Sequence, residues 1–387
     1  MTTAVSAIPV ARPWMDEREA DAARRAILSG WITQGPEVAA FEQEFAAAIG
    51  APHACAASSC TTALHLALVT CGVGAGDEVV TVSHSFIATA NAVRYCGATP
   101  VFVDIDPATF NMDPALVEAA IGPRTKAILC VHQFGMPCDL DAILAVAGRH
   151  GLAVVEDAAC ATGSEILWRG RWERIGRPHG LVACFSFHPR KLLSTGDGGM
   201  LTTGDPDLDR RFRLLRQHGM SVPDTVRHGA PHVIQEEYPL LGFNYRMTDI
   251  QAAIGREQLA RLPAIVTRRR ELAARYTDHL GGVPGVIVPA QPAGARTNWQ
   301  SYVVRVGPGS QRAIMQRLLD QRIATRRGAM NAHRERAYPE GTWRAPGPLA
   351  RSEEARDTAI VLPLFHQLTY AEQDQVIDAV KRAAAAA

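Results

Sequence analysis

Residues 76–106 read GDEVVTVSHSFIATANAVRYCGATPVFVDID and contain a strand–helix–strand pattern. The runs EVVTV (78–82) and PVFVDI (100–105) are short, apolar and rich in β-branched residues, as is typical of buried strands. Between them, SFIATANAVRYCG (85–97) has the apolar spacing of a helix and closes on the glycine that often follows a helix end. This order predicts two parallel strands joined by a helical crossover.

The same alternation continues on both sides of this unit. Further buried strands are expected at 126–132, 152–157, 181–187 and 199–203, and further helices at 61–72, 114–122 and 140–151. Strands alternating with helices predict an α/β fold with a mainly parallel central sheet flanked by helices. Ligands of such sheets bind beyond the carboxyl ends of the strands, so polar residues that directly follow a strand are the candidates for chemistry.

The pattern changes after about residue 205. Arginine-rich helical segments are followed by a polar loop at 221–239, a helix over 248–280, a strand at 301–306, and helices at 311–322 and 369–383. The last helix is preceded by Thr369 with Glu372 three residues on, which predicts a capping box. We expect a large domain over residues 1–262 and a smaller C-terminal α+β domain over residues 263–387.

Composition excludes several classes of partner and site. The 387 residues include 40 Lys+Arg and 39 Asp+Glu, a balance of +1 that disfavours nucleic acid and anionic membranes as main partners. No apolar run reaches the ~18 residues of a spanning helix, and the first residues lack the order of a signal peptide, so we expect a cytoplasmic protein. The eight cysteines form no C-x-x-C pair and several lie in apolar runs, which predicts buried free thiols and no metal site.

Three segments that follow predicted strands hold the candidate chemistry. FSFHPRK (185–191) places Ser186 and Lys191 after a strand and before a glycine-rich turn, although a surface lysine beside a turn gives the same pattern. VVED (154–157) ends on Asp157, which is either used chemically or is a solvated loop acid. ASSCTT (57–62) opens a predicted helix with hydroxyl residues, which indicates either an anion site or an ordinary N-cap.

Together the three segments suit a cofactor that carries both an aldehyde and a phosphate, namely pyridoxal 5′-phosphate (PLP). A lysine forms the Schiff base, a carboxylate keeps the pyridine nitrogen protonated, and an aromatic ring covers the cofactor face. Hydroxyls and a helix N-terminus bind the phosphate. Convergence on one ligand favours the chemical interpretation of each segment.

The order and spacing of these motifs resemble the nucleotide-sugar aminotransferases of the DegT/DnrJ/StrS type, which are fold type I PLP enzymes. The resemblance covers nearly the whole chain and is strongest in these stretches: GWITQGPEVAAFE (30–42), SSCTTALHLAL (58–68), residues 76–106, VVEDAACATGS (154–164), CFSFHPRKLLSTGDGGMLTT (184–203), GFNYRMTDIQAAIGREQL (242–259) and VLPLFHQLTYAEQDQVIDAVK (361–381). It implies a fold type I large domain and a smaller C-terminal domain.

The resemblance also implies a role for individual residues. It makes Lys191 the Schiff-base lysine, Asp157 the partner of the ring nitrogen and Phe86 the aromatic ring that stacks on the cofactor. It assigns phosphate binding to the Ser186 and Thr61 hydroxyls and to the backbone at Cys60. It has Asn244 reach the phosphate of the neighbouring subunit, which implies a homodimer with shared active sites.

Two stretches depart from the family pattern. Many relatives carry Gln or His where this chain has Cys160, and that residue contacts the phenolic oxygen of the cofactor. A thiol is only a weak donor, so the contact is either lost or replaced. The stretch 165–180 is longer than in most relatives and includes Trp168 and Trp172. It forms either a surface flap near the sugar or merely a longer turn.

The expected activity is transfer of an amino group from an amino acid, L-glutamate first, to the keto group of a nucleotide-linked deoxy sugar in deoxysugar or polysaccharide biosynthesis. Lysine at position 191, where dehydrating relatives have histidine, favours transamination. Arg246, Arg326 and Arg327 are candidates for a substrate diphosphate, or merely solvated. The alternatives are aminotransfer to a cyclitol ketone and a non-catalytic regulatory protein with the PLP fold.

Overall fold

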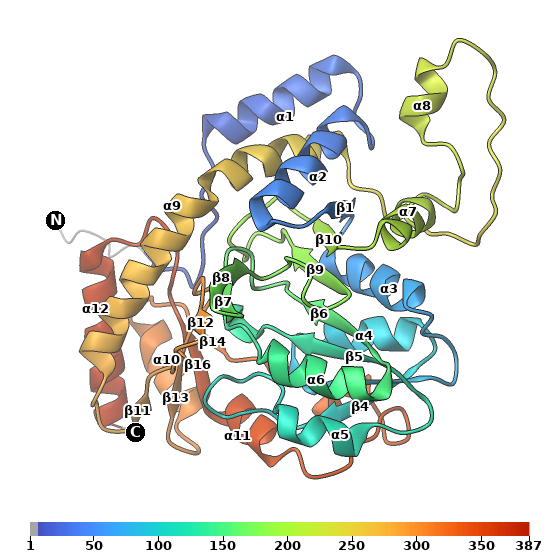
Figure 1. The fold of residues 1–387 in the computed structure, drawn as a ribbon. Helices are drawn as coiled ribbons and strands as arrows, with labels where there is room; N and C mark the ends of the chain where they lie inside the picture. The colour runs from blue at the N-terminus through green and yellow to red at the C-terminus, as the bar shows by residue number, and fades with distance from the viewer. Residues whose placement is uncertain (1–6, 387) are drawn as a thin grey trace.

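A seven-stranded sheet forms the centre of the computed structural model, which describes residues 7–386 (Figure 1). In spatial order its strands are β1 (His53–Ala57), β10 (Gly199–Thr203), β9 (Val182–Ser186), β6 (Ala153–Asp157), β5 (Thr125–Val131), β2 (Glu78–Val82) and β4 (Thr99–Val103). Only β10 runs antiparallel to its neighbours within this sheet. The predicted mainly parallel sheet is confirmed.

Helices cover both faces of the sheet. Side chains of α3 (Cys60–Thr70), α4 (Ala88–Tyr95) and α7 (Pro206–Leu215) share one buried apolar cluster with alternate strand residues. The other face packs against α2 (Pro36–Ile49), α5 (Val117–Ala120), α6 (Leu140–His150) and the first half of α9 (Asp249–Leu280). Successive side chains of each strand point to opposite faces of the sheet, so they contribute to two separate apolar cores.

Two predicted helices are shorter than their apolar pattern. The expected helix at 114–122 is a 3-10 turn, η1 (Pro114–Leu116), followed by the single turn of α5. The expected helix at 85–97 begins only at Ala88, because β3 (His84–Ser85) pairs instead with β15 (Met330–Asn331) far along the chain. This tertiary pairing keeps Ser85 in an extended conformation ahead of α4.

The C-terminal part builds its own core. A four-stranded sheet, β11 (Val286–Ile287), β13 (Tyr302–Val306), β16 (Ala359–Leu362) and β14 (Arg326–Arg327), packs with α10 (Gln311–Asp320), α12 (Tyr370–Ala385) and the second half of α9. α11 (Ala350–Thr358) lies beside it. The predicted capping box at Thr369 is confirmed. α9 runs unbroken across residues 262 and 263, and the domain boundary expected there stays a prediction.

Residues 165–180 form a hairpin of β7 (Glu165–Trp168) and β8 (Arg171–Arg174), to which β12 (Ala295–Arg296) adds a third strand. The Arg296 guanidinium lies 3.8 Å from the Trp172 ring centroid. The polar stretch 221–239 contains α8 (Asp224–Gly229) and projects from the body of the molecule (Figure 1). Among the described helices, none combines the length and apolarity needed to cross a membrane.

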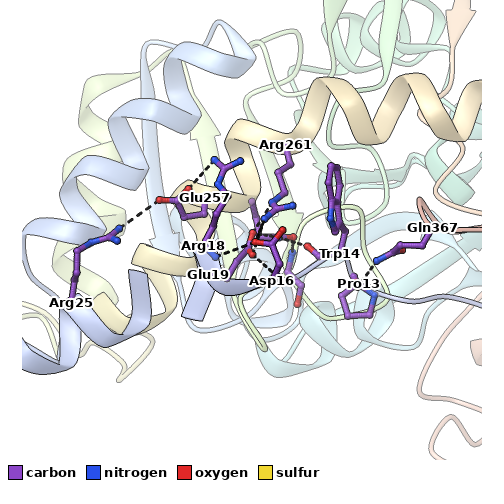
Figure 2. A network of polar contacts seen from close by, with 11 residues as sticks. Pro13, Trp14, Asp16, Arg18, Glu19, Arg25, Glu257, Arg261 and Gln367 are labelled. Atoms are coloured by element: carbon purple, nitrogen blue, oxygen red, sulfur yellow. Dashed lines mark hydrogen bonds and ion pairs between the residues drawn. The ribbon is translucent and has the colours of Figure 1, made fainter. Parts of the chain in front are cut away.

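The segment that precedes α1 (Glu17–Ser29) is clamped onto α9 (Figure 2). The Arg261 side chain pairs with Asp16 and Glu19, at 2.5 and 2.8 Å, and its guanidinium lies 4.4 Å from the Trp14 ring centroid. His366 stacks on Trp14 with centroids 3.8 Å apart. These contacts fix residues 8–16 between the two cores.

Candidate active site

A cavity of about 440 Å³ opens at the carboxyl ends of β5, β6 and β9. The small C-terminal part closes one side of it through residues 326–330 and through Val361, Leu362 and Leu364. The N-terminal segment contributes Val10 and Ala11. Seven of the sequence-predicted site residues line it: Cys60, Thr61, Phe86, Asp157, Cys160, Ser186 and Lys191. Asn244 does not, so the structure brings all but one of the predicted residues together.

Lys191 enters the cavity from the loop after β9. Its backbone N–H donates to the His188 carbonyl at 2.7 Å, which forms a tight turn around Pro189. Its Nζ donates to the Cys160 Sγ at 3.0 Å. Burial disfavours the charged amine, but Cys160 and Asp157 outweigh that penalty, so the pKa of Lys191 is raised. A raised pKa favours the ammonium form of this lysine at neutral pH.

Asp157 is the last residue of β6 and is 5% exposed. Its Oδ2 accepts a hydrogen bond from the Thr89 hydroxyl at 2.7 Å, and its Oδ1 accepts one from the Ala159 N–H at 3.1 Å. Burial raises the pKa of the carboxyl, while these donors and Lys191 oppose the rise. A buried carboxylate of this kind can bind a protonated ring nitrogen.

The N-terminus of α3 offers free donors to an anion. The Ser59 hydroxyl accepts from the Thr62 N–H at 3.2 Å, and the Thr62 hydroxyl accepts from the Ser59 N–H at 3.0 Å. This capping box leaves the N–H groups of Cys60 and Thr61 without a partner among residues 7–386. Both residues line the cavity together with Ser186, and the positive end of the helix favours a phosphate there.

Gly199 makes this anion site possible. A Cβ at Gly199 would lie 2.4 Å from the Ser59 carbonyl carbon and 2.7 Å from the Cys60 nitrogen, both backbone atoms. Only glycine lets β10 pass this close to the turn that opens α3. Gly199, the last residue of the GDGG run (196–199), therefore supports the anion site by packing directly against its backbone.

The remaining predicted residues also fit a flat ring. Phe86 lines the cavity with a side chain that is 62% exposed, a geometry suited to stacking on a ligand. Cys160 contacts Lys191 directly, and its loop is fixed by the Asn298 amide, which donates to the carbonyls of Cys160 and Thr162 at 2.8 and 2.9 Å. The cavity therefore holds groups that could bind the aldehyde, the ring and the phosphate of PLP.

Sequence reasoning missed two buried hydroxyls. Ser85 and Thr89 lie in the stretch that the apolar pattern assigned to a helix, and both support Asp157, directly or in series. Their spacing of four residues could have indicated a shared side of the backbone, but no local pattern shows that Asp157 lies opposite. Val10 and Ala11 were missed for the same reason.

The structure separates the candidate arginines. Arg326 and Arg327 line the cavity, as does Arg190, whereas Arg246 does not. Asn244 is exposed and lies between two residues whose backbones are held: the Phe243 N–H donates to Leu215, and the Tyr245 N–H donates to Arg216. Asn244 is therefore an exposed residue on a fixed backbone that does not line the cavity of its own chain.

None of residues 165–180 lines the cavity. The hairpin packs instead against the arginine-bearing strand β12, so within one chain the two tryptophans are not part of the site.

Comparison with known proteins gives one consistent result. The profile of the DegT/DnrJ/EryC1/StrS aminotransferase family matches residues 13–381. The spore coat polysaccharide biosynthesis protein SpsC of Bacillus subtilis is 40% identical over 381 residues, which cover 97% of this chain and 96% of SpsC. The aminotransferase TlmJ from Streptoalloteichus hindustanus is 37% identical, with a TM-score of 0.90 over 98% of this chain and 100% of its own. The PLP form of the putative sugar aminotransferase Spr1654 from Streptococcus pneumoniae is 27% identical, with a TM-score of 0.89 over 98% of this chain and 99% of its own.

Proposed function

We propose a substrate for this chain on the premise that it belongs to the DegT/DnrJ/EryC1/StrS aminotransferase family, whose members are PLP-dependent enzymes. The predicted family, fold class, reaction class and cofactor are thereby confirmed. The proposed acceptor is a keto group on a nucleotide-linked deoxy sugar, and the proposed amino donor is L-glutamate. The names of two relatives, one a polysaccharide biosynthesis protein and one a putative sugar aminotransferase, support a sugar acceptor.

The observation that carries the nucleotide-linked acceptor is the arginine-rich rim of the cavity. Arg190 and Arg326 form no ion pair within the described residues, and Arg327 has only a contact of 3.6 Å with Glu335. Three guanidinium groups whose positive charge is hardly balanced by nearby carboxylates suit a diphosphate, which accepts paired N–H donors. An acceptor without phosphate would leave this charge unused.

The residues of the cavity divide the work of the reaction. When bound, PLP supplies the carbon that takes up the amino group and a ring that accepts negative charge. Lys191 would hold the cofactor aldehyde between turnovers and take the proton from Cα of the amino donor. Asp157 would keep the ring nitrogen protonated, and Phe86 would cover one face of the ring. The N–H groups at the start of α3 and the Ser186 hydroxyl would bind the phosphate.

A homodimer with shared active sites is part of the proposal. Asn244 is exposed, has a fixed backbone and does not line its own cavity, which supports its use by a second chain. Each cavity would then be completed by its partner, so cofactor binding and association would be linked.

The experiment follows the two halves of the reaction separately. Purified enzyme loaded with PLP is mixed with L-glutamate, L-glutamine, L-aspartate or L-alanine, and the loss of yellow colour is timed. The amino form is then offered nucleotide-linked keto deoxy sugars or a cyclitol ketone, and the product is identified by mass spectrometry. We expect bleaching by L-glutamate and amination of a nucleotide-linked sugar.

Arginine variants test the rim. Arg326→Gln should raise KM for the nucleotide-linked acceptor about tenfold or more and leave bleaching by L-glutamate unchanged. The matched control is Arg336→Gln, an exposed arginine of the same region that does not line the cavity. Turnover of the cyclitol ketone alone would contradict the proposed acceptor, and failure of every amino acid to bleach the enzyme would favour a regulatory protein.

A further inference from the structure

We propose that Ser85 and Thr89 form a hydroxyl chain that holds Asp157 in place as an ionised carboxylate, which makes Thr89 a positioning residue of the active site. The inference rests on the role proposed above for Asp157. It adds two residues, one from β3 and one from α4, to the groups around the proposed position of the ring nitrogen.

The chain consists of two short hydrogen bonds in a buried place. The Ser85 and Thr89 hydroxyl oxygens are 2.8 Å apart, and the Thr89 oxygen is 2.7 Å from the Asp157 Oδ2. Ser85 is 4% exposed and Thr89 is 1% exposed. Ser85 ends β3 and Thr89 is the second residue of α4, so the pairing of β3 with β15 sets the start of the chain.

The direction of the chain follows from counting protons. A hydroxyl group carries one proton, and that of Thr89 is given to Asp157. Ser85 must then be the donor to Thr89. The Ala159 N–H can only donate, and it donates to the other carboxylate oxygen. Both oxygens of Asp157 thus accept from fixed donors, which is the arrangement that favours the ionised form.

Apart from Thr89 and Ala159, few groups near Asp157 offset the cost of burying its negative charge. The titratable groups that interact with it are Lys191 in the loop after β9, His132 directly after β5, and the thiols of Cys60 in α3 and Cys184 in β9; Glu156 precedes it in β6. His132 Nδ1 accepts the Cys138 N–H at 3.1 Å, so its hydrogen sits on Nε2, directed at Glu156 at 3.0 Å.

Lys191 and His132 also lower the pKa of Asp157, and the charge of Lys191 changes during the proposed turnover. Burial raises the pKa of Asp157, and Thr89 is the strongest opposing influence. The hydroxyl of Thr89 and the amide of Ala159 are the partners that persist through the reaction. Their removal should favour the protonated carboxyl, which can no longer hold a proton on the ring nitrogen.

Three variants and one control test the chain. Thr89→Val removes the hydroxyl and keeps the shape, Thr89→Ser keeps the hydroxyl, and Ser85→Ala removes the second donor. The control is Thr81→Val, because Thr81 is equally buried and its hydroxyl donates to the Leu129 carbonyl on β5, away from Asp157.

Two readouts are needed. The first is the infrared carbonyl band of protonated Asp157 in the cofactor-free protein, identified by its absence in Asp157→Asn and followed against pH. The second is the rate of bleaching by L-glutamate, with its KM, in the loaded enzyme.

We expect Thr89→Val to move the infrared midpoint to higher pH and to slow bleaching roughly 10- to 100-fold with KM nearly unchanged, the range that one hydrogen bond to a charged group supplies. Thr89→Ser should restore both properties to within about threefold in rate. Ser85→Ala should shift the midpoint in the same direction by less. Thr81→Val should change neither readout.

The outcomes separate this inference from the proposed function. An unmoved midpoint in Thr89→Val, with the usual loss in Asp157→Asn, would refute the hydroxyl chain alone. A shift of the Ser85→Ala midpoint to lower pH would also refute it, because the chain would then start from a protonated Asp157. Near wild-type bleaching by Asp157→Asn would refute the role of Asp157 itself. If Thr89→Val does not fold, the sign of the Ser85→Ala shift and the Thr89→Ser rate carry the test.

Discussion

Replacing Asp157 with asparagine should separate the stability of the cofactor-free protein from the rate of the enzyme. The side chain is 5% exposed, and its two oxygens accept hydrogen bonds from Thr89 and Ala159. Asparagine has the same shape, so its oxygen can keep the Ala159 N–H while its amide donates to Thr89 by reversing that hydroxyl. The fold should therefore be preserved.

The size of the rate effect comes from the lost charge. A charge-assisted contact in a site that excludes water is worth about 3–4 kcal/mol in the transition state, so kcat should fall by about 10²–10³-fold. The free energy of unfolding of Asp157→Asn, in contrast, should be equal to or higher than that of the wild type. Because burial raises the pKa of Asp157 above its ordinary 3.8, the free energy of unfolding falls as the pH rises from 3.8 through the raised value, and the loss is complete above it. Asparagine avoids that loss.

The assay pairs kinetics with unfolding. Bleaching by L-glutamate is timed in the loaded enzymes, and urea unfolding of the cofactor-free proteins is followed at several pH values. The free energy of unfolding of the variant should equal or exceed that of the wild type at pH 7. The difference should vanish as the pH falls below 3.8, where the carboxyl is neutral in both the folded and the unfolded state.

Either of two results would refute this reasoning. A loss of kcat smaller than about tenfold would mean that the charge does not act in the transition state. A variant less stable than the wild type by more than about 1 kcal/mol at neutral pH would mean that the ionised carboxylate stabilises the fold, in conflict with its burial.

Three further variants probe the rest of the site. Lys191→Ala should abolish transamination and the visible absorbance of the lysine-linked cofactor, measured by spectrophotometry; near wild-type turnover would rule out its role. Mixing Lys191→Ala with Asn244→Ala chains under proven subunit exchange should restore part of the activity, because one site of each heterodimer carries neither lesion, and no recovery would mean that Asn244 does not act across the interface. Gly199→Ala should weaken PLP binding about tenfold or more in a fluorescence titration, since its Cβ would meet the Ser59 backbone at 2.4 Å, whereas Gly196→Ala, where nothing lies within 4 Å, tests the backbone strain alone. Equal affinity of the two glycine variants would contradict the packing argument.

Much of the architecture could be predicted because its signals are local. EVVTV and PVFVDI mark their own strands, and the glycine after residues 85–96 marks a helix end, without knowledge of the partner elements. The carboxyl ends of parallel strands lie at one edge, so Asp157 and Lys191 could be placed at the same edge of the sheet, while their proximity depends on the pairing of β6 with β9. The resemblance to a family added Phe86 and Asn244, which no local pattern distinguishes.

The sequence by itself determined the class of sheet, the strand ends that carry Asp157 and Ser186, and the capping box at Thr369, because each depends on neighbours within a few residues. Only the tertiary structure decided that Thr89 meets Asp157, that Cys160 meets Lys191, and that Val10 lines the cavity. These contacts join residues that are tens to hundreds of positions apart in the sequence. They depend on how the helices pack against the twisted sheet. A shift of one strand pair would break them while leaving every local propensity intact.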